Sequence, residues 1–206
     1  MIRICIAADH SLVREGLRRL LEAQPDFSVT LTVEDGYRLR EELNHVACDV
    51  LLLDIRMPGP GFMETLRRLR REHPEIPILI LSNSPEADYA IRAFKGGVLG
   101  YLRKDADHLT LIEAVRRVSS GKRYMTPALT EAIVDSLTRS DHNDLSDRAF
   151  EVLRMLGSGM STAAVAAHIH LSPKTVGTYR TRIYTKLRLD GMAELIRYAY
   201  EHGLTE

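Results

Sequence analysis

The chain has 206 residues, of which 45% are hydrophobic and 27% are charged, and its 28 basic residues balance its 28 acidic ones. This composition is typical of a globular protein and excludes disorder over most of the chain. The zero net charge argues against a protein that coats nucleic acid with its whole surface. No apolar stretch approaches the roughly 20 residues of a membrane span, and the N-terminus lacks a signal-peptide pattern. We therefore expect a cytoplasmic protein with no membrane partner.

The first 120 residues alternate between short apolar runs and segments with helical spacing. The runs typical of strands are 3–7, 28–33, 49–53, 78–81 and 98–102. The helical patterns are 11–23, 37–46, 62–72, 87–95 and 107–119. Uninterrupted apolar strands are typical of a parallel sheet that is covered on both faces. Residues 1–120 are therefore predicted to form an α/β domain with a doubly wound, five-stranded parallel sheet.

The rest of the chain shows only helical signals. Residues 121–144 are interpreted as a linker that includes a helix at 127–138, because its segment 140–144 (SDHND) is polar throughout. From Leu145 onward, four helical segments are separated by glycine or by a polar turn. Residues 145–206 are therefore predicted to form an all-α, four-helix domain.

Polar side chains directly follow four of the predicted strands, namely those of Asp9, Asp54, Ser82 and Lys104. Because binding sites in parallel sheets lie at the carboxyl ends of the strands, these side chains are expected to meet. Two neighbouring carboxylates repel unless a cation lies between them, and Mg²⁺ prefers such oxygen ligands. The lysine and the hydroxyl suit phosphoryl oxygens. The alternative is that each aspartate caps a helix or a turn, but four suitable groups at four strand ends favour the pocket.

The segments IAADH, LLLDIRMPG, ILILS and GYLRKDA resemble the receiver domain of two-component response regulators, which has a flavodoxin-like fold. The resemblance implies that Asp54 accepts a phosphoryl group from a sensor histidine kinase. It also implies that Asp9, Asp54 and the backbone carbonyl of Arg56 bind Mg²⁺.

The same resemblance implies a packing switch, in which Ser82 and Tyr101 rearrange on phosphorylation while Lys104 holds the phosphate. Two residues depart from the family pattern. Ala8 replaces the first member of the usual acidic pair, which should weaken Mg²⁺ binding. Arg56 is a long cation beside the acceptor, where it either steers phosphodonors or pairs with the acceptor carboxylate.

Within the C-terminal domain, two short helical segments are joined by a tight turn at 170–172. Ser172 precedes Pro173, a pair that is typical of a capped helix start. The segment 172–188 carries five basic residues and no acidic one. This pattern fits a helix that reads the major groove of DNA. A solvated helix face and a generic helical bundle are alternatives that periodicity alone does not exclude.

The segments LSDRAFEVLRML, GMSTAAVAAHIHLSPKTVGTYRTRIYTKL and AELIRYA resemble the LuxR-type DNA-binding domain, with the helix-turn-helix motif at about 162–181. Together with the receiver, this resembles the NarL/FixJ class of response regulators. The resemblance implies that the helix at 173–187 enters the major groove and that the last helix forms much of a homodimer interface. The residues that it places at DNA are Lys174, Thr175, Gly177, Thr178, Arg180, Thr181, Arg182 and Lys186.

We therefore expect a response regulator transcription factor, and not an enzyme, that binds promoter DNA as a dimer and acts with RNA polymerase. The alternative is a LuxR-type regulator that no longer depends on phosphorylation, which Ala8 and Arg56 suggest. A phosphatase that uses Asp54 as nucleophile is a third hypothesis. It lacks a second catalytic acid at 55–57, and it leaves the C-terminal domain unexplained. Gly177 stands where the class commonly has lysine, so we expect modest monomer affinity for DNA and reliance on dimerisation.

Overall fold

The computed structural model describes residues 1–59, 61–82, 87–139 and 145–205. The chain divides into two compact units, Met1–Ile133 and Val134–Glu206. The polar segment 140–144, which the sequence predicts to be a linker, lies outside the described residues. In the part of the chain that is described, no helix combines the length and the apolar character that a bilayer crossing requires.

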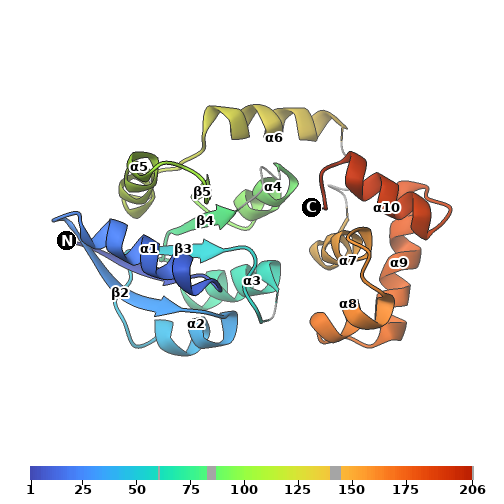
Figure 1. The fold of residues 1–206 in the computed structure, drawn as a ribbon, viewed down its shortest axis with the longest axis horizontal. Coiled ribbons are helices and arrows are strands. Elements are labelled where there is room, and N and C mark those ends of the chain that lie inside the picture. The colour runs from blue at the N-terminus through green and yellow to red at the C-terminus, as the bar shows by residue number, and fades with distance from the viewer. Residues whose placement is uncertain (60, 83–86, 140–144, 206) are drawn as a thin grey trace. The chain divides into compact units, whose positions relative to one another are not determined.

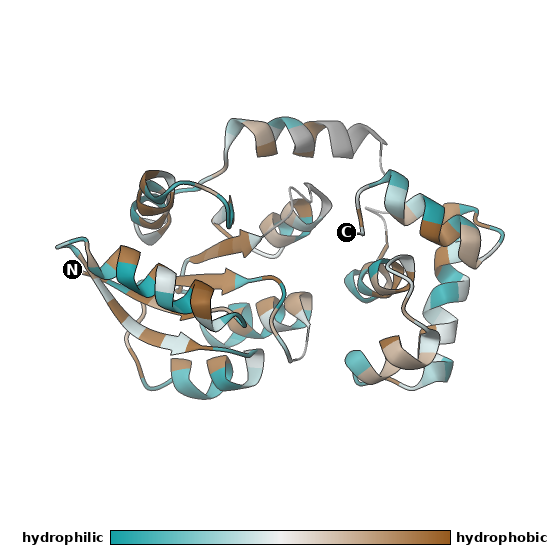
Figure 2. Ribbon diagram, in the orientation of Figure 1, coloured by the Kyte–Doolittle hydropathy of each residue, from teal (hydrophilic) through white to brown (hydrophobic). Residues whose placement is uncertain are grey.

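The first unit is built on a five-stranded parallel sheet with the order β2-β1-β3-β4-β5 (Figure 1). The strands are β1 (Ile2–Ala7), β2 (Phe27–Val33), β3 (Val50–Asp54), β4 (Ile78–Ser82) and β5 (Gly100–Arg103). Every residue of β3 and β4 is buried, and Figure 2 shows these strands as largely hydrophobic, between helices of mixed character. The apolar runs therefore form strands because both of their faces are covered, as the sequence predicts.

Five helices cover the two faces of this sheet. They are α1 (Ser11–Glu22), α2 (Gly36–Leu43), α3 (Phe62–Glu72), α4 (Ala87–Lys95) and α5 (His108–Ser119). Helices α1 and α5 share one face, where Leu21 and Val115 join a core with Ile4, Leu52 and Leu79. Helices α2, α3 and α4 lie on the other face (Figure 1). This is a doubly wound α/β fold.

After α5 the chain returns to the edge of the sheet. The main-chain N–H of Tyr124 donates to the carbonyl of Leu99 at 2.8 Å, and that of Tyr101 donates to the carbonyl of Tyr124 at 3.2 Å. A residue that the sequence assigns to the linker thus pairs with β5. Helix α6 (Pro127–Arg139) follows, and the boundary between the two compact units falls within it.

The second unit consists of helices, with α7 (Asp147–Gly157) in contact with α8 (Thr162–His168), α9 (Pro173–Leu187) and α10 (Met192–Glu201). Its buried apolar side chains come from all four helices and include Phe150, Leu153, Val165, Ile183 and Leu195. A polar contact adds to this packing, because Arg148 donates to the carbonyl of Ile169 at 2.9 Å. The four-helix architecture agrees with the sequence prediction.

Candidate functional site

Asp54 is the last residue of the central strand β3 and is only 2% exposed. The parallel register places Asp54 beside Leu81, so Ser82 comes one residue later on the neighbouring strand. Lys104 directly follows β5, which pairs with β4 on its other side. The topology thus brings the ends of β3, β4 and β5 to one edge of the sheet, as parallel pairing requires.

The carboxylate of Asp54 is held by two groups. It forms an ion pair with the ammonium of Lys104, and the side chains are 1% and 10% exposed. Its Oδ1 also accepts the main-chain N–H of Arg56 at 3.0 Å. The main-chain N–H of Lys104 donates to the carbonyl of Ser82 at 2.7 Å. Lys104 therefore forms an ion pair with Asp54, and Arg56 is exposed.

Asp9 lies at the same edge, because β1 and β3 are neighbours and Ala7 pairs with Leu53. The Oδ1 of Asp9 accepts the main-chain N–H of His10 at 2.8 Å and lies 2.5 Å from Nδ1 of that imidazole. Burial acts to raise the pKa of Asp9, but the hydrogen bond and charge of His10, with the charge of Lys104, hold this pKa below its ordinary value.

The alternative role for Asp9, as the cap of a helix, is not what the structure shows. The N-cap residue of α1 is His10, and its side chain makes no capping hydrogen bond. Asp9, His10 and Asp54 instead each offer a ligand atom within 4.8 Å of the others. The two carboxylates are hard oxygen donors, so this donor set fits a divalent cation.

Two neighbours of this pocket escaped the sequence analysis. The Nη1 of Arg14 donates to the carbonyls of Ala8 and Asp9, at 2.6 and 2.8 Å, and so holds the loop that carries Asp9. Ala8 itself is fully buried and offers no ligand. His10 is the second missed neighbour, and the only signal for it was its place next to Asp9.

The two remaining residues of the predicted switch, Ser82 and Tyr101, are 5% and 1% exposed. Tyr101 pairs with Ile80 in the register of β4 and β5, two positions before Ser82 pairs with Arg103. Both side chains therefore belong to the interior of the same sheet region. Their rearrangement on phosphorylation stays a prediction.

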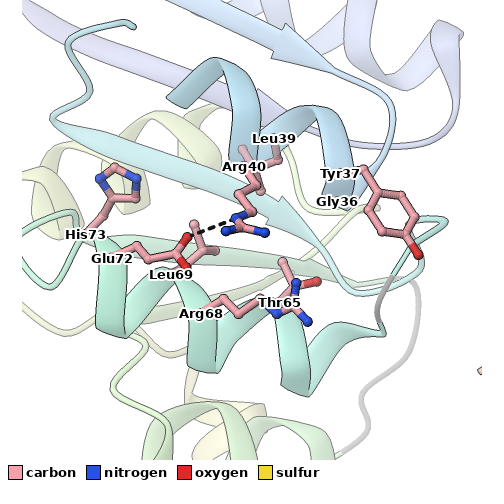
Figure 3. Close-up of a pocket in the computed structure, with 9 residues that line it drawn as sticks. All are labelled: Gly36, Tyr37, Leu39, Arg40, Thr65, Arg68, Leu69, Glu72 and His73. Atoms are coloured by element: carbon pink, nitrogen blue, oxygen red, sulfur yellow. Dashed lines mark ion pairs between the residues drawn. The ribbon is translucent and has the colours of Figure 1, made fainter. Parts of the chain in front are cut away.

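A pocket lies between α2 and α3 (Figure 3). It is lined by Gly36, Tyr37, Leu39, Arg40, Thr65, Arg68, Leu69, Glu72 and His73. The side chains of Arg40 and Glu72 form an ion pair across the two helices, at 3.4 Å between Nε and Oε2. The lining includes none of the predicted site residues, so this pocket is separate from the acidic one.

In the second unit, a tight turn leads from α8 into α9. His170 in this turn has a left-handed backbone with φ of 54°. The hydroxyl oxygen of Ser172 accepts the main-chain N–H of Thr175 at 3.1 Å, and Pro173 occupies the first turn of α9. The Ser-Pro start that the sequence predicts is therefore formed, with one of the free N–H groups at the helix start satisfied.

Helix α9 presents a polar face along its length. Its exposed residues among those predicted to contact DNA are Lys174, Thr178, Thr181, Arg182 and Lys186, whereas Thr175, Gly177 and Arg180 are half-buried. The hydroxyls of Thr178, Thr181 and Thr185 donate to carbonyls four residues earlier, at 3.1, 3.2 and 3.1 Å. Thr185 was missed in the sequence, although its spacing of four from Thr181 places it on the same face.

Arg180 differs from the other basic residues of α9. Its Nη1 donates to the hydroxyl of Thr162 on α8 at 3.4 Å. Its Nε is buried, with no hydrogen-bond partner among the described residues. Arg180 thus packs between the two helices, and its side chain contributes to their mutual orientation.

Family models match both parts of the chain. Residues 4–116 match the model described as response regulator receiver domain, and residues 143–199 match the one described as bacterial regulatory proteins, luxR family. The response regulator GacA of Pseudomonas viridiflava is 31% identical over 100% of this chain and 99% of its own length. The response regulator UvrY of Escherichia coli K12 is 32% identical over 99% of this chain and 96% of its own.

Solved structures agree on the fold. RcsB from Salmonella enterica serovar Typhimurium, bound to promoter P1flhDC with the phosphomimetic BeF₃⁻, has a TM-score of 0.74 at 23% identity, over 96% of this chain and 97% of that one. The response regulator ChrA of a heme-sensing two-component system has a TM-score of 0.55 at 31% identity, over 98% of both chains. The chain therefore belongs to the two-component response regulators of the NarL/FixJ class, which join a receiver domain to a LuxR-type DNA-binding domain.

Proposed function

We propose that Asp54 is the residue on which this response regulator is phosphorylated, by a sensor histidine kinase. The observation that carries the proposal is the buried carboxylate at the end of the central strand, with the Lys104 ammonium bound to it. A carboxylate oxygen of Asp54 forms the new bond to phosphorus, and the phosphohistidine nitrogen of the kinase leaves. The ammonium of Lys104 then has phosphoryl oxygens in reach to pair with.

Mg²⁺ is the cofactor that we propose for this pocket, with Asp9, Asp54 and the backbone carbonyl of Arg56 as ligands. Bound there, the ion neutralises charge on the phosphoryl oxygens during transfer. The main-chain N–H of Arg56 already orients the carboxylate of Asp54, at 3.0 Å. Because Ala8 supplies no carboxylate, we expect the affinity for Mg²⁺ to be weak.

The phosphoryl group then acts through packing. It replaces one carboxylate by a group with several strong acceptor oxygens and about one further negative charge. Ser82 carries a hydroxyl one position beyond the partner of Asp54 on the neighbouring strand β4. Tyr101 is the large buried side chain on the next strand, β5. We propose that their rearrangement changes the equilibrium between an inactive form and a form that dimerises and binds promoter DNA.

For the second unit we propose that α9 enters the major groove. In this proposal the exposed residues Thr178 and Thr181 contact base edges, and Gly177 beside them allows close approach. The exposed cations Lys174, Arg182 and Lys186 make the phosphate contacts. Helix α10 supplies the homodimer interface in this proposal, and RNA polymerase is the further partner.

The proposal also sets the domain limits and the place of action. The receiver domain spans 1–120, the linker 121–144 with its helix, and the DNA-binding domain 145–206. The protein acts in the cytoplasm and is not an enzyme in its own right. A regulator that binds DNA without phosphorylation is the second candidate, and Ala8 is the observation that favours it, since a fully buried methyl stands where the family has an acid.

The test combines phosphorylation with DNA binding. Native protein and the variants Asp54→Asn and Asp54→Ala are treated with acetyl phosphate and excess Mg²⁺, and labelling is measured by mass spectrometry. Binding is then measured on a duplex that the native protein selects from a random pool. We expect labelling and a gain in affinity for the native protein alone.

Asp105→Asn is the matched control, because this aspartate is exposed and lies close to Lys104 in the sequence. It should behave as the native protein does. Equal labelling of native protein and the Asp54 variants would overturn the assignment of Asp54. Labelling of native protein without any change in DNA affinity would favour the phosphorylation-independent regulator instead.

A further inference from the structure

The chain has two cysteines, and both belong to the same face of the sheet. Ile4 and Ile6 of β1 point into the core that α1 and α5 share. Successive strand residues point to opposite faces, so Cys5 points to the face that α2 covers (Figure 1). Cys5 is fully buried, whereas Cys48, in the segment between α2 and β3, is half-buried.

The segment that carries Cys48 crosses β1 on this face. On one side of it, the carbonyl of Ala47 accepts the hydroxyl of Thr30 on β2 at 3.0 Å. On the other side, the main-chain N–H of Asp49 donates to the carbonyl of Arg3 at 2.8 Å, just before β3 begins. Because β1 lies between β2 and β3 in the sheet, Cys48 is held over β1.

A β-bulge directs Thr30 to the same point. Cys5 pairs with Leu31 and the residue before it pairs with Val29, so Thr30 is an extra residue on β2. Its hydroxyl oxygen lies 3.6 Å from Sγ of Cys5. One hydroxyl thus contacts the first thiol and also the carbonyl that precedes Cys48.

The two thiols are hydrogen-bonded to each other. This bond lowers the pKa of Cys5 and raises that of Cys48, because Cys48 keeps its proton while Cys5 ionises. The thiolate, and not the thiol, is the nucleophile in disulfide chemistry. The pair therefore combines a sulfur that ionises readily with a protonated sulfur beside it, and half-buried Cys48 gives small molecules access from solvent.

We propose that Cys5 and Cys48 are a redox modification site that a hydroperoxide converts into a disulfide. One thiolate of the pair attacks a peroxide oxygen, so that an S–O bond forms while the O–O bond breaks and hydroxide leaves. The other sulfur then attacks the sulfenic acid, an S–S bond forms, and the S–O bond breaks with loss of water. The two thiols lose two electrons and two protons, and hydrogen peroxide is reduced to two water molecules.

The disulfide links β1 to the segment before β3, whereas Asp54 is the last residue of β3. The bond encloses the part of the chain that forms α1, β2 and α2, and it restricts the unfolded state. Oxidation therefore stabilises the first unit and removes no group from the acidic pocket. Disulfides of cytosolic proteins are usually transient, and many of them sense redox conditions.

The test uses the full-length protein without phosphodonor and hydrogen peroxide as the oxidant. After treatment the protein is denatured, labelled with N-ethylmaleimide and weighed by mass spectrometry. We expect two labels before oxidation, none after it, and two again after reduction with dithiothreitol. Because the chain has only two cysteines, a monomer that loses both labels in this reversible way contains the bond between Cys5 and Cys48.

Thermal denaturation supplies the second measurement. The Tm of the oxidised protein should exceed that of the reduced protein, since the link restricts the unfolded chain. Cys48→Ala is the matched control, because it leaves the buried Cys5 in place and removes its partner. Its label should not be lost reversibly in the monomer, and peroxide should not raise its Tm.

Three results would overturn the proposal. Native protein that keeps both labels after peroxide treatment would show that the thiols are inert. Loss of label that dithiothreitol does not reverse would indicate oxidation beyond the disulfide state. Dimers linked by a disulfide, in place of the internal bond, would show that the two sulfurs do not pair within one chain. None of these measurements on native protein depends on the folding of a variant.

Discussion

Gly157 and Ala199 bring two helices of the second unit into direct contact. A Cβ atom on Gly157 would lie 2.4 Å from the Cβ of Ala199 and 3.0 Å from a methyl of Thr205. Such a distance is too short for two carbon atoms, so α7 and α10 approach each other as closely as they do only because residue 157 has no side chain. α10 is also the helix that we propose for the dimer interface.

Gly157→Ala should therefore destabilise the second unit. We expect a loss of about 1–3 kcal/mol in the free energy of unfolding, the range for overpacking a closely packed site. Urea denaturation followed by circular dichroism measures it. Gly177→Ala is the control, because nothing lies within 4 Å of a Cβ there. That variant should gain up to about 1 kcal/mol from helix propensity, and a loss of stability in it would contradict the argument.

The buried ion pair at Asp54 predicts a coupling between its two members. Lys104→Met leaves the nearly buried carboxylate of Asp54 without its ammonium. Removal of one partner of a buried pair destabilises by about 3–5 kcal/mol, and contact of this pocket with solvent should place the loss at the lower end. Lys104→Met combined with Asp54→Asn should recover part of the loss. Additive losses in this double-mutant cycle, measured by thermal denaturation, would show that the pair contributes no coupling energy.

The ion pair of Arg3 and Asp49 predicts a dependence of stability on pH. The side-chain hydrogen bonds of Arg3 lower the pKa of Asp49 from its ordinary 3.8 to about 2. Because the pKa is lower in the folded state, the stabilisation is complete above pH 3.8 and disappears as the pH falls toward 2. The side chain of Asp49 is 32% exposed, so we expect only about 1 kcal/mol from it.

Asp49→Asn should remove this dependence. The difference in unfolding free energy between native protein and the variant is expected to be largest above pH 4 and to shrink toward pH 2. Urea denaturation at a series of pH values measures it. Asp105→Asn removes a more exposed partner, whose side chain is 65% accessible, and should show a smaller difference. A difference for Asp49→Asn that is constant with pH would contradict the prediction.

The basic residues of α9 should differ in how much each contributes to the salt dependence of the affinity for DNA. Arg182→Ala and Lys186→Ala each remove an exposed charge, and each should reduce the slope of log affinity against log salt by about 0.9. Arg180→Ala should leave that slope nearly unchanged and lower the thermal stability of the second unit, because its guanidinium contacts Thr162. A full reduction of the slope by Arg180→Ala would instead place this side chain at a phosphate.

Much of the fold could be predicted because the spacing of apolar residues along the sequence reflects which positions are buried. The apolar runs gave all five strands, although β3 begins at Val50 and not at Asp49, whose side chain is occupied by Arg3. The predicted helix at 37–46 ends earlier, at Leu43, since Asn44 caps α2. Strand ends and helix ends depend on single side-chain contacts, which periodicity does not contain.

For the site, the prediction that two aspartates lie close together depended on the order of the strands in the sheet. Asp9 and Asp54 were expected to be neighbours because they follow the first and third strands, and the register of β1 and β3 places them so. The partners were harder to foresee. That His10 turns back onto Asp9, and that Arg14 holds two carbonyls of the same loop, depends on loop backbone geometry that has no counterpart in hydrophobic spacing.

The pairing of Tyr124 with the edge of β5 has a mechanical consequence. The peptide N–H of Tyr101 is bonded to the carbonyl of Tyr124, and three residues later the chain enters α6. A displacement of the backbone at Tyr101 is therefore passed to the first turn of that helix through the short segment between Tyr124 and Pro127. Strand β5 and helix α6 are thus connected at Tyr124, through a main-chain hydrogen bond and the short segment that leads to Pro127.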